Sequence, residues 1–547
     1  MGYFIKKISS IRSNFYVKLG FLIIIIGQLP ILLHIYHTPS GYYYPFVDQV
    51  SASDYYYIAI VRFGMGADWL LKIPYVTTYH QASIIQFPFI ILGKLSLLFG
   101  IGPAEMIAIF RVIGGIILTA SAVLLLSSIL PKKIRKSAFI LFLFTEPLPS
   151  FTKSIFTDDF LAWVWHFGDA ARRISIAPVH YTIGKGLCLL SLFFLFAYME
   201  KKRISLFYFA LLIIVVSGII YPPPNFIIAF SLTLSILIYS ALMKFGKKII
   251  VSFIPFIIFI LASMLPLIIL KMELAKGYPW NMWSKVELGW NDPIIPFEAD
   301  YFRMFWPLFI LLTFSIPIAI KFKKFTFNFF FLFIWAISAY LLFPFANWLS
   351  VGKFRFTEGV QIFPLACISA ITLSVIGNIV KERWGRKTAF FIGKVCLTGF
   401  FAYFLFFTSQ VYRDALLRFW PYWINVYFSP RDVESFKFLD SKVPDDAIVL
   451  TDDLSANYLP AFARVRTIIG FSDSYEKYPD FKFETKQAVE IIQGIKKSEE
   501  AEQYMKLKQI EYVYQNKSLY GQNQIYPELL EAVFDNEKFR IYKVKGI

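Results

Sequence analysis

The chain has 547 residues, of which 57% are hydrophobic and 17% are charged, and its formal net charge is +18 at pH 7. Soluble proteins carry about 25% charged residues, and apolar runs of about 20 residues recur along most of this sequence, so an ordinary soluble protein is excluded. The basic residues stand in short runs between apolar segments, as the positive-inside rule expects. The composition therefore predicts a polytopic membrane protein, and it gives no reason to expect a nucleic-acid partner.

The first apolar segment follows a basic N-terminus and has no small-residue cleavage site after it, so we interpret it as a retained span. Segment 83–99 contains Pro88 and Lys94, and its uninterrupted apolar core is too short to cross a bilayer. We expect this segment to be an interfacial or re-entrant helix. About 11 spans remain, in segments 19–36, 106–130, 137–149, 181–199, 204–220, 224–243, 249–270, 303–320, 327–345, 358–380 and 388–411.

With this assignment, the basic loops all fall on the cytoplasmic side of the cell membrane, as the positive-inside rule requires. The N-terminus is then cytoplasmic, and the first outer loop (37–105) and the tail (412–547) are extracytoplasmic. Arg111, Lys185 and Lys394 lie near predicted span ends, where long side chains can reach the interface. The basic loops are 131–136, 201–203, 244–248, 321–324 and 381–387.

The composition changes near residue 412, which predicts two domains. A transmembrane domain with the first outer loop occupies 1–411, and an extracytoplasmic α/β domain occupies 412–547. In the tail, the patterns predict a helix from residue 429, one amphipathic helix over 485–509, and strands at 447–451, 510–515 and 539–544. The predicted fold class is a polytopic α-helical membrane protein with a small α/β domain.

The first outer loop contains a helical pattern that starts at Asp54. Asp54, Tyr57 and Arg62 share one face with Ile58 and Val61. Tyrosine and tryptophan suit the headgroup level, so we expect a juxtamembrane helix here. An acid in the first turn stabilises a helix N-terminus. This structural role alone is enough to explain an acid at position 54.

Several longer motifs carry a family resemblance. An N-terminal span, an outer loop with acids at a juxtamembrane helix, and "PYVTTYHQASIIQFPFIILGKLSLLFGIG" (74–102) resemble the GT-C superfamily of membrane glycosyltransferases, in particular the protein O-mannosyltransferase and aminoarabinose transferase branch. "RISIAPVHYTIG" (173–184) and "GKFRFTEGVQIFPLACISA" (352–370) resemble a poorly characterised prokaryotic group with the same architecture. The chain lacks the adjacent Asp-Glu pair of the O-mannosyltransferases.

The resemblance implies transfer of a hexose or pentose from a polyprenyl-phosphate donor to an acceptor outside the membrane, with inversion of the anomeric centre. In such enzymes the first outer loop supplies a catalytic acid, which by position is Asp54 or, as an alternative, Asp48. A carboxylate suits the general base that takes the acceptor's proton. Cationic side chains that donate hydrogen bonds suit the lipid phosphate, and the candidates are Arg355, Lys353 and Arg62. Arg355 and Glu358 are also spaced for a local ion pair.

Histidines and acids elsewhere offer further candidates. His80 and His180 each precede or begin an apolar segment, and together with Tyr57 they are candidate substrate-binding residues; the alternative is a hydrogen-bonded interfacial histidine. Acids and a histidine in 157–172 could bind a divalent metal, but their spacing matches no tight ligand template, so no metal site is assigned. Asp452 and Asp453 follow a predicted strand; acids at a strand end can be catalytic, but they are also ordinary turn residues, and no nucleophile or base pairing is visible beside them.

Three functions are compatible with these patterns. The first is a glycosyltransferase acting on a lipid-linked donor, with a protein, lipid or glycan acceptor. The second is a transporter or flippase of lipid-linked saccharides, which would need charged residues within the spans. The third is a non-catalytic envelope protein that presents its outer domain to a partner.

Overall fold

Two compact units make up the structure, which is a computed structural model. The helical unit comprises Met1–Leu29, Phe110–Lys271 and Glu287–Asp414, and the α/β unit comprises Pro30–Ile109, Met272–Val286 and Ala415–Ile547. From the sequence, the first outer loop was expected in one domain with the spans, whereas in the structure this loop belongs to the same compact unit as the tail. The structure describes residues 14–47, 52–146, 178–242, 247–288, 297–321, 326–358, 360–417, 427–470 and 481–546.

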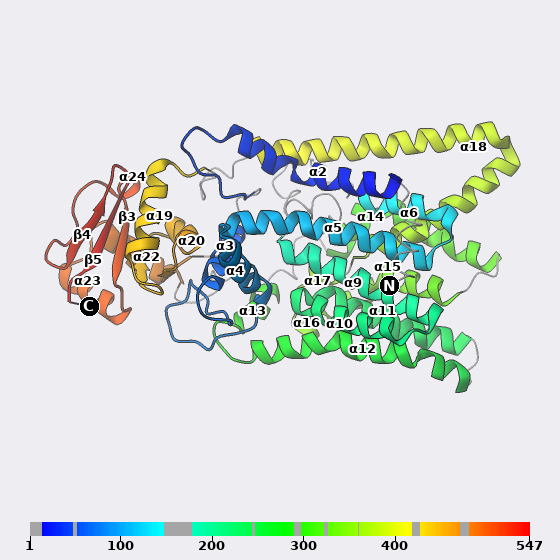
Figure 1. The fold of residues 1–547 in the computed structure, drawn as a ribbon, viewed down its shortest axis with the longest axis horizontal. Coiled ribbons are helices and arrows are strands. Elements are labelled where there is room, and N and C mark those ends of the chain that lie inside the picture. Colours follow the sequence, from blue (N-terminus) through cyan, green and yellow to red (C-terminus); the bar gives the residue numbers. More distant parts are fainter. Residues whose placement is uncertain are drawn as a thin grey trace. The chain divides into compact units, whose positions relative to one another are not determined.

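Long apolar helices dominate the helical unit (Figure 1). Seven helices among the described residues are long and apolar enough to cross a membrane, which confirms a multi-pass membrane protein. The predicted total of about 11 spans is not confirmed, because several other apolar helices have 17 residues or fewer. The unit contains all or part of α2 (Asn14–His37), α5 (Pro103–Ile129), α6 (Lys132–Phe144), α9 (Val179–Lys201), α10 (Ile204–Ile220), α11 (Pro222–Leu242), α12 (Lys247–Leu274), α14 (Phe297–Lys321), α15 (Phe327–Leu342), the 3-10 turn η1 (Phe343–Phe345), α16 (Ala346–Leu349), α17 (Phe354–Thr357) and α18 (Ile362–Leu417).

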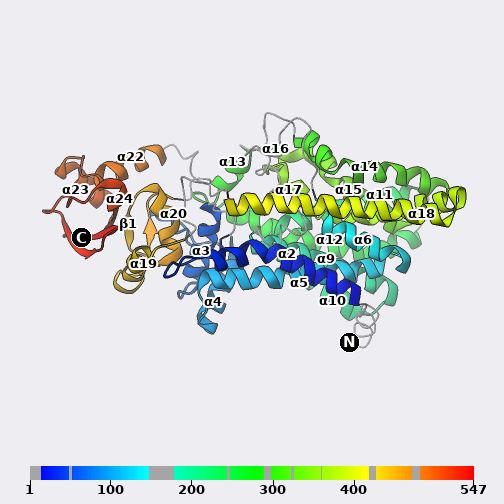
Figure 2. The same ribbon diagram turned by 90° about the horizontal axis from the view of Figure 1, so that it is seen from above.

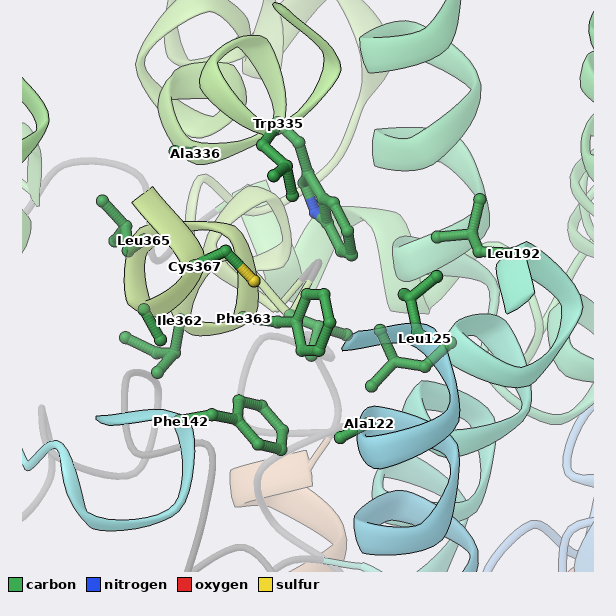
Figure 3. Packing of buried hydrophobic residues seen from close by; sticks show 14 of the residues in the cluster. Ala122, Leu125, Phe142, Leu192, Trp335, Ala336, Ile362, Phe363, Leu365 and Cys367 are labelled. Carbon is green, nitrogen blue, oxygen red and sulfur yellow. The ribbon is translucent and has the colours of Figure 1, made fainter. Parts of the chain in front are cut away.

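Aromatic and branched side chains from distant segments fill the core of this unit (Figure 3). The ring of Phe363 in α18 lies 5.5 Å from that of Phe142 in α6 and 5.6 Å from that of Trp335 in α15. Leu125 of α5 and Leu192 of α9 belong to the same buried cluster. Five helices are therefore joined by one apolar core.

Small residues let α9 approach its neighbours closely, as is common between membrane helices. A side chain at Gly186 would meet the backbone of Leu118 in α5, and one at Gly184 would meet Tyr221 at the start of α11. These approaches place the beginning of α9 directly against α5 and against Tyr221.

The segment predicted as spans 358–380 and 388–411 is one helical element with a break. α18 has 56 residues, and Gly385 within it has φ +85°. The break lies inside the predicted basic loop 381–387, so the two predicted spans are separate helices, but the turn takes one residue where a seven-residue loop was expected. The Lys, Glu and Arg residues around it are good helix formers, and the glycine adopts the positive φ that redirects the chain. Figures 1 and 2 show the bend between the arms of α18 and the length of its second arm.

The α/β unit contains a five-stranded mixed sheet in the order β2-β1-β3-β5-β4. β1 is parallel to β2 and β3, whereas β5 is antiparallel to β3 and β4. The three predicted strands correspond to β1 (Ile448–Leu450), β3 (Tyr512–Asn516) and β5 (Phe539–Val544); β2 (Arg466–Thr467) and the edge strand β4 (Leu530–Asp535) were not predicted.

The helices of the α/β unit come from the tail, from the first outer loop and from the segment 272–286. The single helix predicted over 485–509 was wrong, since Gly494 at φ +69° separates two helices there. The helices of the unit are α3 (Ala52–Gly64), α4 (Phe87–Phe99), α13 (Met282–Leu288, in part), α19 (Pro430–Lys442), α20 (Asp453–Phe462), α22 (Phe481–Ile492), α23 (Ser498–Leu507) and α24 (Lys517–Tyr520).

The segment expected not to span, 83–99, contains α4. Its 13 residues give a length of about 20 Å, which is short of the roughly 30 Å hydrocarbon core. α4 packs closely on α3, because a side chain at Gly93 would collide with the backbone of Val61 and Gly64. The Lys94 ammonium donates to the Gly66 carbonyl and lies 5.0 Å from the Trp69 ring. α4 is thus fixed against the helix that carries Asp54.

Candidate functional site

The predicted site residues fall into both compact units. Asp54, Tyr57, Arg62 and His80 lie in the α/β unit, whereas His180, Lys353 and Arg355 lie in the helical unit. Asp48 lies outside the described residues.

Arg355 is the centre of a polar cluster in the helical unit. It lies on the short helix α17, and its Nη1 donates to the Tyr181 hydroxyl at 3.0 Å, to Glu358 Oε2 at 3.2 Å and to the Tyr221 hydroxyl at 3.4 Å. Its guanidinium carbon lies 4.5 Å from the ring centre of Phe354. The predicted local ion pair with Glu358 is confirmed, and the Glu358 side chain is only 1% exposed.

Two tyrosines and a histidine form the wall of this cluster. Tyr181 lies in the first turn of α9, and Tyr221 lies between α10 and α11; their ring centres are 4.3 Å apart. The buried ring of His180 meets Tyr181 edge-on at 4.4 Å and Tyr221 at 5.6 Å. Sequence reasoning singled out His180 and Arg355 but missed both tyrosines, although Tyr181 directly follows His180 in the motif "RISIAPVHYTIG".

Apart from the Glu358 carboxylate, which is paired with Arg355, the cluster consists of hydrogen-bond donors that suit an anion. A guanidinium, two phenol hydroxyls and an imidazole all donate hydrogen bonds, and charge-assisted bonds from arginine to phosphate are among the stronger ones. Lys353, half-buried at the start of α17, adds a second cation two residues from Arg355.

Asp54 lies in the first turn of α3 in the α/β unit, as predicted, and its residue is 7% exposed. The helix is enclosed by protein on most sides, since Tyr55, Tyr56 and residues 58–61 are also buried. The Tyr57 ring stacks on Phe89 of α4 at 4.5 Å. The carboxyl group therefore has a fixed support and little contact with water.

Arg62 is engaged inside the α/β unit. Its Nη1 donates to Asp440 of α19 at 2.7 Å, and its Nε donates to the Ala461 carbonyl of α20 at 3.0 Å. These partners favour a structural tie between α3 and the tail over contact with a donor phosphate.

Both ring nitrogens of His80 have backbone partners. Nε2 accepts from the Ile73 amide at 3.0 Å, and Nδ1 lies 2.9 Å from the Thr78 carbonyl oxygen, to which it donates in the neutral tautomer. The ring also lies edge-on to Trp280, 6.1 Å away. This geometry favours the alternative of a hydrogen-bonded histidine over direct substrate binding.

Two cations within the spans are buried in the helical unit. Lys185 is 0% exposed and Arg111 is 3% exposed. Both were expected to reach the interface, but their side chains are enclosed by protein within the unit, whereas Lys394 in α18 is exposed. Ionisable side chains inside a membrane bundle commonly mark functional sites.

The described residues contain no group of three or more His, Cys, Asp or Glu side chains that could hold a metal. The acid-rich segment 157–172, the other candidate for metal binding, lies outside the described residues. Asp452 is fully buried and caps α20 by accepting from the Ser455 amide at 2.9 Å, which agrees with a structural role. Burial raises the pKa of its carboxyl group.

Comparison with known proteins defines the fold. No family model and no curated protein matches the sequence. Among solved structures, the oligosaccharyltransferase of Archaeoglobus fulgidus tethered to an acceptor peptide with the NVT sequon is similar, with a TM-score of 0.53 and 13% identity over 93% of this chain and 70% of that chain. The oligosaccharyltransferase AglB of that organism, in complex with an inhibitory peptide and a dolichol-phosphate, is similar with a TM-score of 0.51 and 12% identity over the same shares of the two chains. ArnT from Cupriavidus metallidurans bound to undecaprenyl phosphate has a TM-score of 0.49 and 10% identity over 96% of this chain and 97% of that chain.

The chain shares its fold with the oligosaccharyltransferase of Archaeoglobus fulgidus, which agrees with the GT-C-like fold that the sequence resemblance predicted. At identities this low, the likeness defines the fold and selects no branch within it.

His80 gives a testable pH dependence. Burial lowers its pKa from the usual value of 6.5, so the folded protein favours neutral imidazole. The stability contributed by His80 is complete above about pH 6.5 and is lost as the pH falls toward the lowered pKa. Hydrogen exchange of the paired backbone at Leu71 and Ser83, corrected for intrinsic rates, should therefore speed up between pH 7 and pH 5.

His80→Gln should remove this acid sensitivity, since glutamine does not titrate. The control is His37→Gln at an exposed histidine, which should keep the wild-type pH dependence. An unchanged acid response in His80→Gln would show that another group is responsible.

Proposed function

We propose that the protein is a glycosyltransferase that moves a sugar from a polyprenyl-phosphate donor to an acceptor on the extracytoplasmic face, with inversion at the anomeric carbon. The observation that supports this proposal most is the GT-C fold over 93% of the chain, shared with an oligosaccharyltransferase that was solved with a dolichol-phosphate. The Arg355 cluster and the buried acid of α3 supply the two kinds of group that such a reaction needs.

The donor phosphate is assigned to the Arg355 cluster. Arg355 and the hydroxyls of Tyr181 and Tyr221 already form one hydrogen-bonded group, and Lys353 adds positive charge beside it. As the bond between the anomeric carbon and the phosphate oxygen breaks, negative charge grows on the leaving phosphate. Fixed donors that stabilise charge as it develops lower the barrier.

Asp54 is assigned as the general base. The acceptor oxygen attacks the anomeric carbon and forms the new glycosidic bond, its proton passes to the Asp54 carboxylate, and polyprenyl phosphate leaves with the bonding electron pair. A single displacement of this kind inverts the anomeric centre. The position of Asp54 in the first turn of a well-supported helix suits this role, because an acid there also stabilises the helix.

A flippase of lipid-linked saccharides is the second candidate. Arg111 and Lys185, buried in helices that are long enough to span the membrane, are the kind of residue that a transport pathway uses. A flippase would move the donor without breaking its sugar–phosphate bond.

Replacing the proposed base tests the transferase most simply. Asp54→Asn should lower turnover of radiolabelled polyprenyl-phosphate sugars by roughly a hundredfold or more, since general bases contribute about 10²–10⁴-fold. Asp68→Asn, at an exposed acid of the same loop, is the matched control and should keep wild-type turnover. Equal rates for wild type and Asp54→Asn would remove Asp54 as the base.

Replacing the proposed phosphate ligand should change donor binding. Arg355→Gln should lower kcat/KM for the donor by roughly ten- to a hundredfold, because a hydrogen bond to a charged group contributes about 1.5–3 kcal/mol. Arg383→Gln, at an exposed arginine of α18, is the control. Thermal unfolding of both variants accompanies the kinetics. A stable Arg355→Gln protein with wild-type kcat/KM would contradict the assignment.

A further inference from the structure

Three consecutive tyrosines on α3 contact three different parts of the α/β unit. Successive residues of a helix are turned by about 100°, so Tyr55, Tyr56 and Tyr57 point in three directions. They directly follow Asp54. Their contacts therefore determine the rotation of α3 at the residue proposed to do the chemistry.

The tail forms the wall that Tyr55 contacts. The Tyr55 ring is fully buried, and its centre lies 6.1 Å from Phe428, 6.2 Å from Phe462 and 6.4 Å from Tyr458. Phe462 and Tyr458 belong to α20, which packs along α3. Aromatic pairs at these distances are stabilising beyond the area they bury.

Other segments of the same unit form the remaining walls. Tyr56 lies 6.1 Å from Tyr75 of the first outer loop and 6.2 Å from Trp283 of α13, and Tyr57 stacks on Phe89 of α4. The tail thus supplies one of three supports for α3, and the first outer loop and the segment 272–286 supply the others.

Polar contacts fix α3 along its axis as well. Arg62, two turns after Asp54, donates to both Asp440 and the Ala461 carbonyl in the tail. At the other side of the loop, Tyr43 and Phe428 exchange two backbone hydrogen bonds of 2.9 and 2.8 Å. An ion pair of this partly exposed kind contributes little by itself, so the attachment of α3 to the tail depends on this pair together with the Ala461 hydrogen bond and the Tyr55 ring contacts.

We propose that the tail is a positioning element for the reaction, acting on Asp54 through Tyr55 and Arg62. This inference rests on the proposed role of Asp54 as the base. The tail itself needs no catalytic group: it holds α3 in the rotation that aims the carboxylate. A misplacement of about 1 Å caused by a remote change can lower a rate roughly a hundredfold.

Kinetics of stable variants test this role. Tyr55→Leu and Arg62→Ala should each lower kcat by roughly tenfold or more, with donor KM changed less than about threefold, because neither residue is expected to bind the donor. Tyr55→Phe keeps the ring and should restore wild-type kcat. Arg62→Ala combined with Asp440→Ala should be no worse than Arg62→Ala alone, as expected for residues that act as a pair.

The matched control is Arg431→Ala. Arg431, like Arg62, is an ion-paired arginine, but it lies in the tail and its partners, Glu434 and Glu537, lie in the tail as well. It should leave kcat unchanged. An equal loss in Arg431→Ala would show that general destabilisation of the tail, and no positioning of α3, causes the effect.

Hydrogen exchange of the α3 backbone tests the same proposal without any activity. Exchange over residues 55–62 should speed up in Tyr55→Leu and in Arg62→Ala but not in Arg431→Ala. If the wild type turns over no donor, the proposed function fails, and if Asp54→Asn keeps full turnover, only the role of Asp54 as the base fails. In both cases this exchange result still reports whether the tail holds α3. Unchanged exchange together with wild-type kcat in Tyr55→Leu would overturn the positioning role.

Discussion

The rotation of one helix, α3, is the constraint on which the proposed chemistry depends. An acid in its first turn is useful only if the carboxylate points in one direction, and three adjacent aromatic rings set that direction through contacts with separate segments. Gly64 and Gly93 allow α4 to lie directly against the same helix. The first outer loop, the segment 272–286 and the tail are thereby joined into one compact unit around Asp54.

Local spacing predicted part of the candidate site. The i, i+3 spacing of Arg355 and Glu358 predicted their ion pair, and the helical pattern that starts at Asp54 predicted an acid in a first helical turn. The hydroxyl partners of Arg355 were not predictable, because Tyr181 and Tyr221 come from 174 and 134 residues away. Contacts of this range depend on which helices pack together, and one sequence contains no direct signal for that. The same reason explains the tail partners of Arg62.

Apolar length and charge alternation predicted the fold class, and β-branched runs located three strands of the sheet. The errors arose at one glycine and at two buried cations. Gly494 divides the helix expected over 485–509, and a pattern of apolar residues does not show where a single residue interrupts a helix. Gly385, by contrast, breaks α18 inside the predicted loop. Lys185 and Arg111, expected to reach the interface, are buried within the helical unit, which hydropathy along one segment does not reveal. This burial keeps a transport function in contention beside the transferase.

The fate of the donor's sugar–phosphate bond distinguishes these two functions most directly. The measurement uses the purified full-length chain in vesicles, polyprenyl-phosphate donor with a radiolabelled sugar, and cell-envelope extract as the source of acceptors. The transferase account predicts that label leaves the lipid, that polyprenyl phosphate is released in equal amount, and that the new linkage has the inverted anomeric configuration. Label that stays on the lipid and crosses to the other leaflet would contradict it.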